Sequence, residues 1–196
     1  MSSNKQLYIL IIACICFTNA AAQSYDKQYA ACSEALRKLT KIDSVYFAML
    51  QKRDSCLAGV PAPDFTATTI DNERIELSKL RGKVVVLNFW FTRCQPCISE
   101  IPGLNKLVEL YAGKKVTFIS ITYDSTETVM RFLKQHPFKF KIVANNDTVR
   151  RYIFKLFSAW PYTIIINKEG KIADMQSISK GRDTFVYFNE QIKKLL

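Results

Sequence analysis

Two cysteines separated by two residues stand at a predicted junction between a strand and a helix. Residues 83–90 form an apolar run rich in valine, which is typical of a strand buried on both faces. Residues 94–113 follow with apolar side chains at helical spacing, and Cys94 and Cys97 open this segment. The spacing brings both sulfurs within reach of one disulfide, and a helix N-terminus places free N–H groups beside Cys94. This arrangement favours a thiolate and restricts the chain to folds that join a buried strand to a helix.

The chemistry predicted for this pair is thiol–disulfide exchange. In such motifs the thiol pKa falls from about 8.5 to roughly 3.5–7.5, and the thiolate attacks disulfides. Pro96 is compatible with the first helical turn, where its missing N–H has no intrahelical partner. A zinc site would need a second CxxC or a pair of histidines, and the chain has neither. We therefore predict that Cys94 attacks and Cys97 resolves the mixed disulfide, with no metal or other cofactor.

The first 22 residues predict a secretory signal peptide. A basic residue precedes an apolar run at 7–17, which is too short to span a bilayer, and small residues at 20–22 suit signal peptidase. We predict that the mature chain begins at Gln23 and resides in the periplasm or cell envelope. Cleavage after Ala20, a lipoprotein acylated at Cys14, and a membrane anchor that is not cleaved remain alternatives.

The chain carries a formal net charge of +11 at pH 7. Its lysines and arginines are scattered, and no basic run is interleaved with aromatic residues. We interpret this charge as a solvated surface that suits an anionic membrane or an acidic partner. The sequence therefore predicts no nucleic-acid binding.

An N-terminal helical extension is predicted at residues 23–58. The stretch 24–57 has no Gly or Pro and shows apolar residues at helical spacing. In one straight helix Cys32 and Cys56 would lie roughly 36 Å apart, so they can bond only if the segment folds back, and weak helix formers at 40–44 mark the bend. Because removal of the signal peptide leaves four cysteines, we predict a stapling Cys32–Cys56 disulfide. The alternative is a second exchanging thiol pair.

Gly59 and two prolines shortly after it mark a boundary before a compact domain at residues 59–196. The predicted elements are a hairpin at 65–77, strands at 83–90, 116–122, 139–143, 162–167 and 171–178, and helices at 94–113, 126–135, 147–157 and 183–196. Strands that alternate with helices, followed by a terminal hairpin and helix, indicate an α/β fold with a mixed sheet covered on both faces.

From about residue 61 to the C-terminus the chain resembles the TlpA/ResA-like thiol–disulfide oxidoreductases of the thioredoxin superfamily. The markers are APDF at 62–65, LRGKVVVLNFW at 80–90, CQPC at 94–97, EIP at 100–102 and WPYT at 160–163. The resemblance implies a thioredoxin-like fold, in which a central mixed β-sheet has helices on both faces. The N-terminal helical segment lies outside the resemblance, so its role cannot be inferred from the family.

The resemblance also implies roles for individual residues. It makes Pro161 a cis proline opposite the cysteines, with the backbone of Trp160 available to pair with an extended substrate. Glu100 looks like the buried active-site glutamate of the ResA-like proteins, which raises thiol pKa and relays protons. A trans proline and a surface glutamate are the simpler alternatives. The expected substrate-binding residues are Trp160, Pro161, Trp90, Gln95 and Pro96.

Two related chemistries fit the residues less well. Peroxidase relatives need a threonine three residues before the reactive cysteine, and Phe91 occupies that position. Copper-chaperone relatives use a distant histidine. The only histidine, His136, precedes Pro137 at a predicted helix end, where a surface cap is the expected role.

Together, the predicted signal peptide, the CxxC motif and the resemblance predict an exported enzyme that exchanges the Cys94–Cys97 disulfide with cysteines of envelope proteins. TlpA/ResA-like proteins are mostly reductants, and some prepare cytochrome c apoproteins for haem attachment. We therefore predict a monomeric protein-disulfide reductase fed by a membrane dithiol donor of the DsbD/CcdA type. The alternatives are a net oxidant that donates its disulfide, and a non-catalytic thioredoxin-fold binding module.

Overall fold

A computed structural model of the chain describes residues 24–157, 159–176 and 183–196. The signal peptide predicted at 1–22, including Cys14, lies outside these residues. Within them, no helix combines the length and the apolar character needed to cross a membrane.

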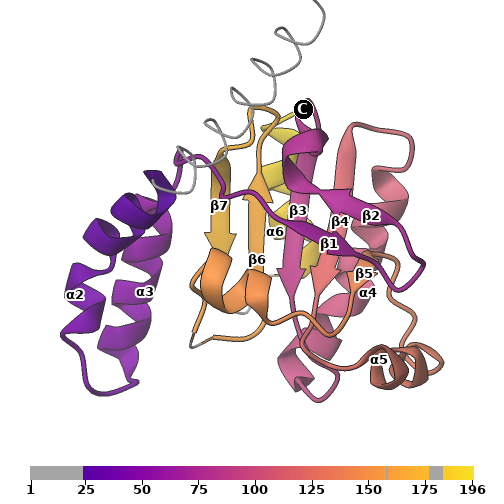
Figure 1. Ribbon diagram of the computed structural model, residues 1–196, viewed down its shortest axis with the longest axis horizontal. Coiled ribbons are helices and arrows are strands. Elements are labelled where there is room, and N and C mark those ends of the chain that lie inside the picture. Colours follow the sequence, from indigo (N-terminus) through magenta and orange to yellow (C-terminus); the bar gives the residue numbers. More distant parts are fainter. Residues whose placement is uncertain (1–23, 158, 177–182) are drawn as a thin grey trace, which may run out of the picture.

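A five-stranded mixed sheet forms the centre of the protein (Figure 1), with strand order β5-β4-β3-β6-β7. The strands are β3 (Val84–Phe89), β4 (Val116–Ile121), β5 (Lys141–Val143), β6 (Tyr162–Ile166) and β7 (Ile172–Gln176). β3, β4 and β5 are parallel, whereas β6 runs antiparallel to both β3 and β7. Every residue of β3 and β6 is buried, as expected for continuous apolar runs in a covered sheet. The predicted mixed sheet is confirmed.

Helices cover one face of this sheet. α4 (Gln95–Leu110) and α6 (Thr184–Lys193) pack on each other behind the sheet in the view of Figure 1, and α5 (Thr126–Leu133) follows β4. The buried residues between these helices and the sheet include Ile101, Leu104, Phe118, Val129, Phe188 and Ile192. α4 begins at the CxxC motif, as predicted, and Gly113 with φ of 73° lies just beyond its end. Glycine adopts this backbone conformation without steric cost.

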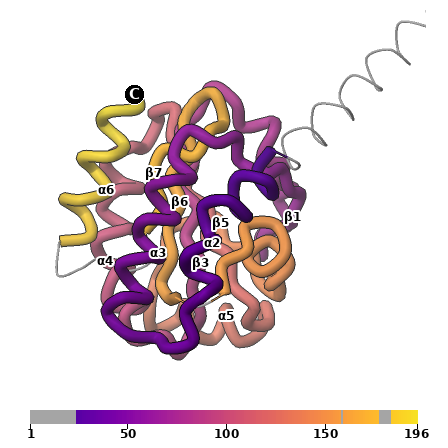
Figure 2. The backbone as a smooth tube through the Cα atoms, turned by 90° about the vertical axis from the view of Figure 1, so that its left-hand side faces the viewer, coloured from indigo at the N-terminus to yellow at the C-terminus, as the bar shows by residue number. Residues whose placement is uncertain are grey.

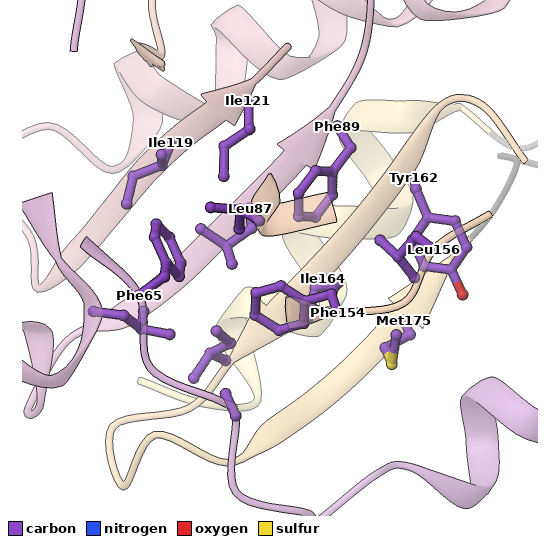
Figure 3. Packing of buried hydrophobic residues seen from close by; sticks show 14 of the residues in the cluster. Phe65, Leu87, Phe89, Ile119, Ile121, Phe154, Leu156, Tyr162, Ile164 and Met175 are labelled. Carbon is purple, nitrogen blue, oxygen red and sulfur yellow. The ribbon is translucent and has the colours of Figure 1, made fainter. Parts of the chain in front are cut away.

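A hairpin covers part of the other face. β1 (Thr66–Thr68) pairs with β2 (Arg74–Glu76), and a 3-10 turn, η1 (Leu77–Leu80), leads into β3. Figure 3 shows the packing beneath this hairpin, where aromatic and aliphatic side chains from distant parts of the chain meet. These buried residues include Phe65, Leu87, Phe89, Ile119, Phe154, Tyr162 and Ile164.

The N-terminal segment forms a helical hairpin beside β7 (Figures 1 and 2). Residues 24–32 are helical, and α2 (Glu34–Arg37) and α3 (Ser44–Cys56) follow. The chain reverses between α2 and α3, where the side chain of Asp43 caps α3 by accepting hydrogen bonds from two backbone N–H groups at 2.9 and 3.0 Å.

This segment is stapled and shares the core of the sheet. Cys32 and Cys56 form a disulfide with a Cα–Cα distance of 5.8 Å, so the segment folds back in the way that such a bond requires. Tyr25, Leu50 and Leu57 belong to the same buried cluster as residues of β3 and β6. The segment is therefore packed against the sheet and does not extend away from it.

The prediction of a helix at 147–157 is wrong, because the helical part is much shorter. The structure has a short π-helical turn, η2 (Val149–Ile153), after which Lys155 adopts φ of 55° and turns the chain away. A positive φ is uncommon for a residue with a side chain. The carbonyls of Phe154 and Lys155 accept hydrogen bonds from tyrosines 129 and 126 positions away. The spacing of apolar residues at 147–157 cannot reveal hydrogen-bond partners that lie so far away in the sequence.

Candidate active site

Cys94 and Cys97 form a disulfide at the N-terminus of α4, with 2.02 Å between the sulfurs. Cys94 is the N-cap residue, and its Sγ accepts a hydrogen bond of 3.2 Å from the N–H of Cys97. In the reduced protein this N–H and the positive end of the helix dipole favour a thiolate on Cys94. The junction between β3 and α4 thus provides the two sulfurs, the N–H group that binds the sulfur of Cys94, and the helix N-terminus beside it.

The overall exposure of the two cysteines does not distinguish them, because Cys94 is 4% and Cys97 is 3% exposed. Their positions do differ. Cys94 precedes the helix between the exposed residues Arg93 and Gln95, whereas Cys97 lies within the first turn. The helix-cap position suits Cys94 for the attacking role.

Pro161 lies at the same end of the sheet as the cysteines. The Trp160–Pro161 peptide bond is cis. Tyr162 follows as the first residue of β6 and is paired with Phe89, the last residue of β3, which leads into the CxxC motif. The register of two central strands therefore places the proline beside the start of α4.

A pocket of about 480 Å³ joins three of the predicted site residues: Pro96, Glu100 and Pro161. Residues at the start of α6, including Thr184, line its other side. Glu100 is 5% exposed and lies three residues after Cys97 on α4, so both side chains are on one side of the helix. A carboxyl group is thus held close to the disulfide in a poorly solvated environment.

An aromatic cluster borders the site. Phe91, Tyr123 and Trp160 contact one another, with ring centroids separated by 5.6 Å, 5.2 Å and 5.7 Å. The guanidinium of Arg150 lies 4.6 Å from the centre of the Trp160 ring, a cation–π distance. Burial raises the pKa of Tyr123, and the nearby Arg93 and Arg150 oppose that rise.

Sequence reasoning missed Tyr123 and Arg150 as members of the site. Tyr123 follows β4 and Arg150 lies in η2, so neither is close to the cysteines in the sequence. A signal was available for Tyr123, because residues just after the carboxyl ends of adjacent parallel strands gather at one edge of a sheet. No comparable local signal exists for Arg150.

Trp90 lies beneath the site. Its side chain is 1% exposed and packs against Phe132 and Phe138 with centroid distances of 5.2 and 5.5 Å. Among the residues predicted to bind substrate, Gln95 and Pro96 are exposed, whereas Trp90 does not reach the surface. In this structure Trp90 supports the CxxC motif from the core.

Within the residues that the structure describes, no three His, Cys, Asp or Glu side chains gather in a way that could hold a metal ion. His136 stacks on Phe132 with a centroid distance of 4.6 Å. The chemically distinctive groups at this edge of the sheet are therefore the two sulfurs and a buried carboxyl.

Comparison with known proteins gives consistent matches. Residues 58–175 match the AhpC/TSA family. The thiol-disulfide oxidoreductase ResA of Bacillus cereus is 33% identical over 156 residues, which cover 78% of this chain and 86% of that protein. ResA of Bacillus subtilis is 33% identical over 132 residues, or 66% of this chain and 72% of that protein. A thiol:disulfide interchange protein of the thioredoxin family from Chlorobium tepidum has a solved structure with a TM-score of 0.59 and 25% identity, covering 69% of this chain and 94% of that one.

Proposed function

Because this chain belongs to the AhpC/TSA family and is a thiol–disulfide oxidoreductase of the ResA type, we propose that it is a net reductant of protein disulfides in the cell envelope. Cys94 and Cys97 carry the reaction, and Glu100 assists it. The observation that carries this proposal is the burial of Glu100, at 5% exposure, three residues after Cys97 on the helix that begins at the disulfide.

The reaction begins with the reduced pair. The Cys94 thiolate attacks one sulfur of a substrate disulfide, the second substrate sulfur leaves as a thiolate, and a mixed disulfide forms. Cys97 then attacks the Cys94 sulfur, which closes the Cys94–Cys97 disulfide and releases the first substrate sulfur. The substrate gains two electrons from the enzyme, and its two released thiolates take up protons from the solvent. Glu100 accepts the proton of Cys97 as that thiol attacks.

The charges around the pair support the proposed direction of exchange. Stabilising the Cys94 thiolate makes a dithiol pair more oxidising, and a carboxylate close to the sulfurs opposes that stabilisation. Glu100 supplies such a carboxyl on α4. The two residues between the cysteines, Gln95 and Pro96, add no positive charge. These features support a reducing pair.

Substrate binding is proposed at the surface around Pro161. An extended substrate segment pairs with the backbone of Trp160, which precedes the cis bond. Its flanking side chains contact the exposed Gln95 and Pro96 on one side and the aromatic cluster containing Tyr123 on the other. Tyr123 is 43% exposed and so is available for such contact.

The cellular setting is proposed from the sequence. The signal peptide at 1–22 directs export, and the mature enzyme combines the extension at 23–58 with the thioredoxin-like domain at 59–196. Each turnover leaves the enzyme oxidised, so net reduction requires a donor, for which we propose a membrane dithiol protein of the DsbD/CcdA type. The enzyme acts as a monomer, and apocytochromes c are among the proposed substrates, in line with the similarity to ResA.

Equilibration with glutathione buffers tests the direction. A potential near the thioredoxin end of the scale, about −270 mV, is expected, and one near about −120 mV would overturn the reductant proposal. Cys97→Ser leaves the mixed disulfide unresolved, so this variant should trap substrates from the envelope. Cys94→Ser lacks the attacking thiol and is the matched control. Equal trapping by both variants would contradict the assigned roles.

A further inference from the structure

We propose that the N-terminal helical segment, residues 24–57, positions the loop that carries Pro161 for exchange with protein substrates. We use the term cis-proline loop for residues 154–157 and 159–161, which lie between η2 and β6, together with Tyr162, the first residue of β6. Three side chains of the segment act as positioning residues: Tyr25, Tyr29 and Arg53. The inference rests on the proposed function of Pro161 in substrate binding.

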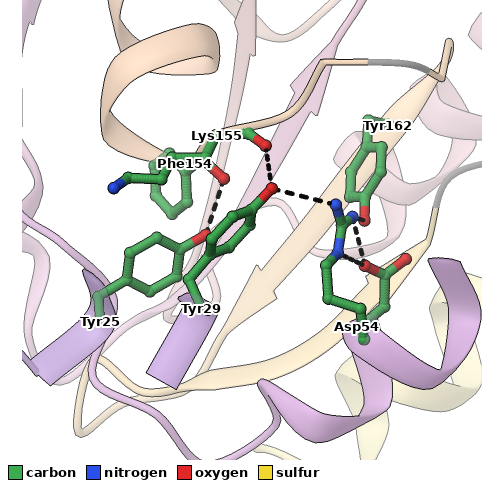
Figure 4. A network of polar contacts seen from close by, with 7 residues as sticks. Tyr25, Tyr29, Asp54, Phe154, Lys155 and Tyr162 are labelled. Carbon is green, nitrogen blue, oxygen red and sulfur yellow. Dashed lines mark hydrogen bonds and ion pairs between the residues drawn. The ribbon is translucent and has the colours of Figure 1, made fainter. Parts of the chain in front are cut away.

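Two tyrosines hold the start of the cis-proline loop (Figure 4). The Tyr25 hydroxyl donates to the carbonyl of Phe154 at 2.8 Å. The Tyr29 hydroxyl donates to the carbonyl of Lys155 at 2.7 Å. Tyr25 is completely buried, and its ring packs edge-on against Phe154. The ammonium of Lys155 also pairs with Asp26 at 2.9 Å. The point where the chain leaves η2 is therefore bound to the N-terminal segment by backbone and side chain.

Arg53 holds the other end of the loop. Its Nη2 donates to the hydroxyl of Tyr162 at 2.7 Å, and Tyr162 directly follows Pro161. The same guanidinium binds Asp54, with Nε and Nη2 at 3.0 and 2.6 Å from one carboxylate oxygen. Burial by itself lowers the pKa of Arg53, but Tyr162 and Asp54 raise it above its ordinary value, so the guanidinium stays charged. Arg53, Asp54 and Tyr162 are 3%, 5% and 2% exposed, and charge-assisted hydrogen bonds are strong in such surroundings.

The two anchor points belong to one network. Arg53 Nη1 lies 3.4 Å from the Tyr29 hydroxyl. The tyrosine that binds one end of the loop therefore contacts the arginine that binds the other end. The Cys32–Cys56 disulfide joins the same two helices, three residues after Tyr29 and three residues after Arg53. The disulfide thus holds the helices together one turn away from the contacts with the loop.

Between its ends the loop is held from η2. The guanidinium of Arg150 donates to the carbonyl of Leu156 and lies over the Trp160 ring. The position of the substrate-binding backbone therefore depends on side chains from the N-terminal segment and from η2. A binding surface that is already ordered loses less conformational entropy when a substrate chain binds. This advantage applies to protein substrates that lie on the loop, and not to small disulfides that need only reach a sulfur.

The test compares the full-length protein with a variant carrying Tyr25→Phe and Tyr29→Phe, which lacks both hydroxyls but keeps both rings. Exchange is measured with insulin as the protein disulfide and with oxidised glutathione as the small one. The KM for insulin should rise about three- to tenfold. A change of this size corresponds to the free energy that one ordinary hydrogen bond contributes. The kcat, the rate with glutathione and the redox potential should stay unchanged. Tyr111→Phe removes a hydroxyl bonded to Asn189 at 2.7 Å and should change nothing, as the matched control.

An unchanged KM for insulin in the folded double variant overturns the proposal. Equal losses with insulin and glutathione also overturn it, because they indicate damage to the cysteine pair itself. If the double variant does not fold, Tyr29→Phe alone is tested by amide hydrogen exchange. Exchange at residues 154–157 that is no faster than in the wild type then refutes the role. A strongly oxidising potential would refute the reductase function alone, since the KM difference can be measured for exchange in either direction.

Discussion

Arg53 of α3 and Tyr162 of β6 are joined by a hydrogen bond of 2.7 Å, although 109 positions separate them in the sequence. Both side chains are buried, and Tyr162 is the neighbour of the cis proline. A charged group in the N-terminal segment thereby binds the side chain of the residue that follows Pro161. The stability of the segment and the geometry of the site consequently depend on some of the same atoms.

Arg53→Met should lower the free energy of unfolding by about 3–5 kcal/mol, because it leaves the Asp54 carboxylate buried without its partner. Urea unfolding of the oxidised protein measures this change. Replacing both residues, Arg53→Met with Asp54→Leu, should recover most of the loss, since no unpaired charge then remains. Arg131→Met removes an exposed partner of Glu127 and should leave stability unchanged. A small effect of Arg53→Met would contradict the importance of this ion pair.

Replacing Cys32 and Cys56 together by serine should lower the free energy of unfolding by about 3.5 kcal/mol, the value expected for a closed loop spanning 24 positions. The redox potential of Cys94–Cys97 should remain that of the wild type. Peptide mapping without reductant should recover Cys32 linked to Cys56. Either of these cysteines linked to Cys94 in the resting protein would instead indicate an internal relay.

Glu100→Gln should make Cys94 of the reduced protein more reactive at neutral pH. Removing a buried carboxylate near the pair removes a charge that opposes the thiolate, so more Cys94 is ionised at a given pH. The rate of alkylation by iodoacetamide between pH 4 and pH 9 measures this, with an expected increase of severalfold at pH 7. Glu109→Gln, an exposed change on the same helix, is the control. Identical profiles for Glu100→Gln and the wild type would exclude Glu100 from the mechanism.

We predict that the stability of the folded protein depends on pH through Asp174. It lines a pocket of about 390 Å³ together with Asp54 of α3. Burial raises the pKa of Asp174 above its ordinary value of 3.8, and the hydroxyl of Tyr187 and other hydrogen-bond donors only partly offset this. The folded protein therefore binds this proton more tightly than the unfolded chain. The stabilising contribution is complete below about pH 3.8 and is lost as the pH rises through the folded-state pKa.

Asp174→Asn should accordingly be more stable than the wild type at pH 7 and equally stable near pH 3.5. Thermal unfolding at both pH values tests this. Asp71→Asn, at an exposed position in the β1–β2 hairpin, should show no such difference. A stability gain for Asp174→Asn that is the same at both pH values would contradict the assignment to titration of this group.

The sequence by itself determined the elements whose causes lie within a few residues of one another. The valine-rich run at 83–90 contains β3, because a continuous apolar run is typical of a strand buried on both faces. The CxxC motif begins α4, where the first backbone N–H groups of the helix are free. The spacing of Glu100 after Cys97 also placed the carboxyl on the correct side of that helix. The α/β fold and the thiol–disulfide chemistry followed from these local signals and from the family resemblance.

Only the tertiary structure decided which distant side chains complete the site. Tyr123 and Arg150 meet Trp160 there, and the buried Trp90 lies beneath it. The helix predicted at 147–157 stops early, and the carbonyls after η2 are bound by tyrosines more than a hundred positions away. Periodicity reports the spacing of residues along one element. It does not report which group elsewhere in the chain will satisfy a buried donor or acceptor, since that partner arrives only when the chain has folded.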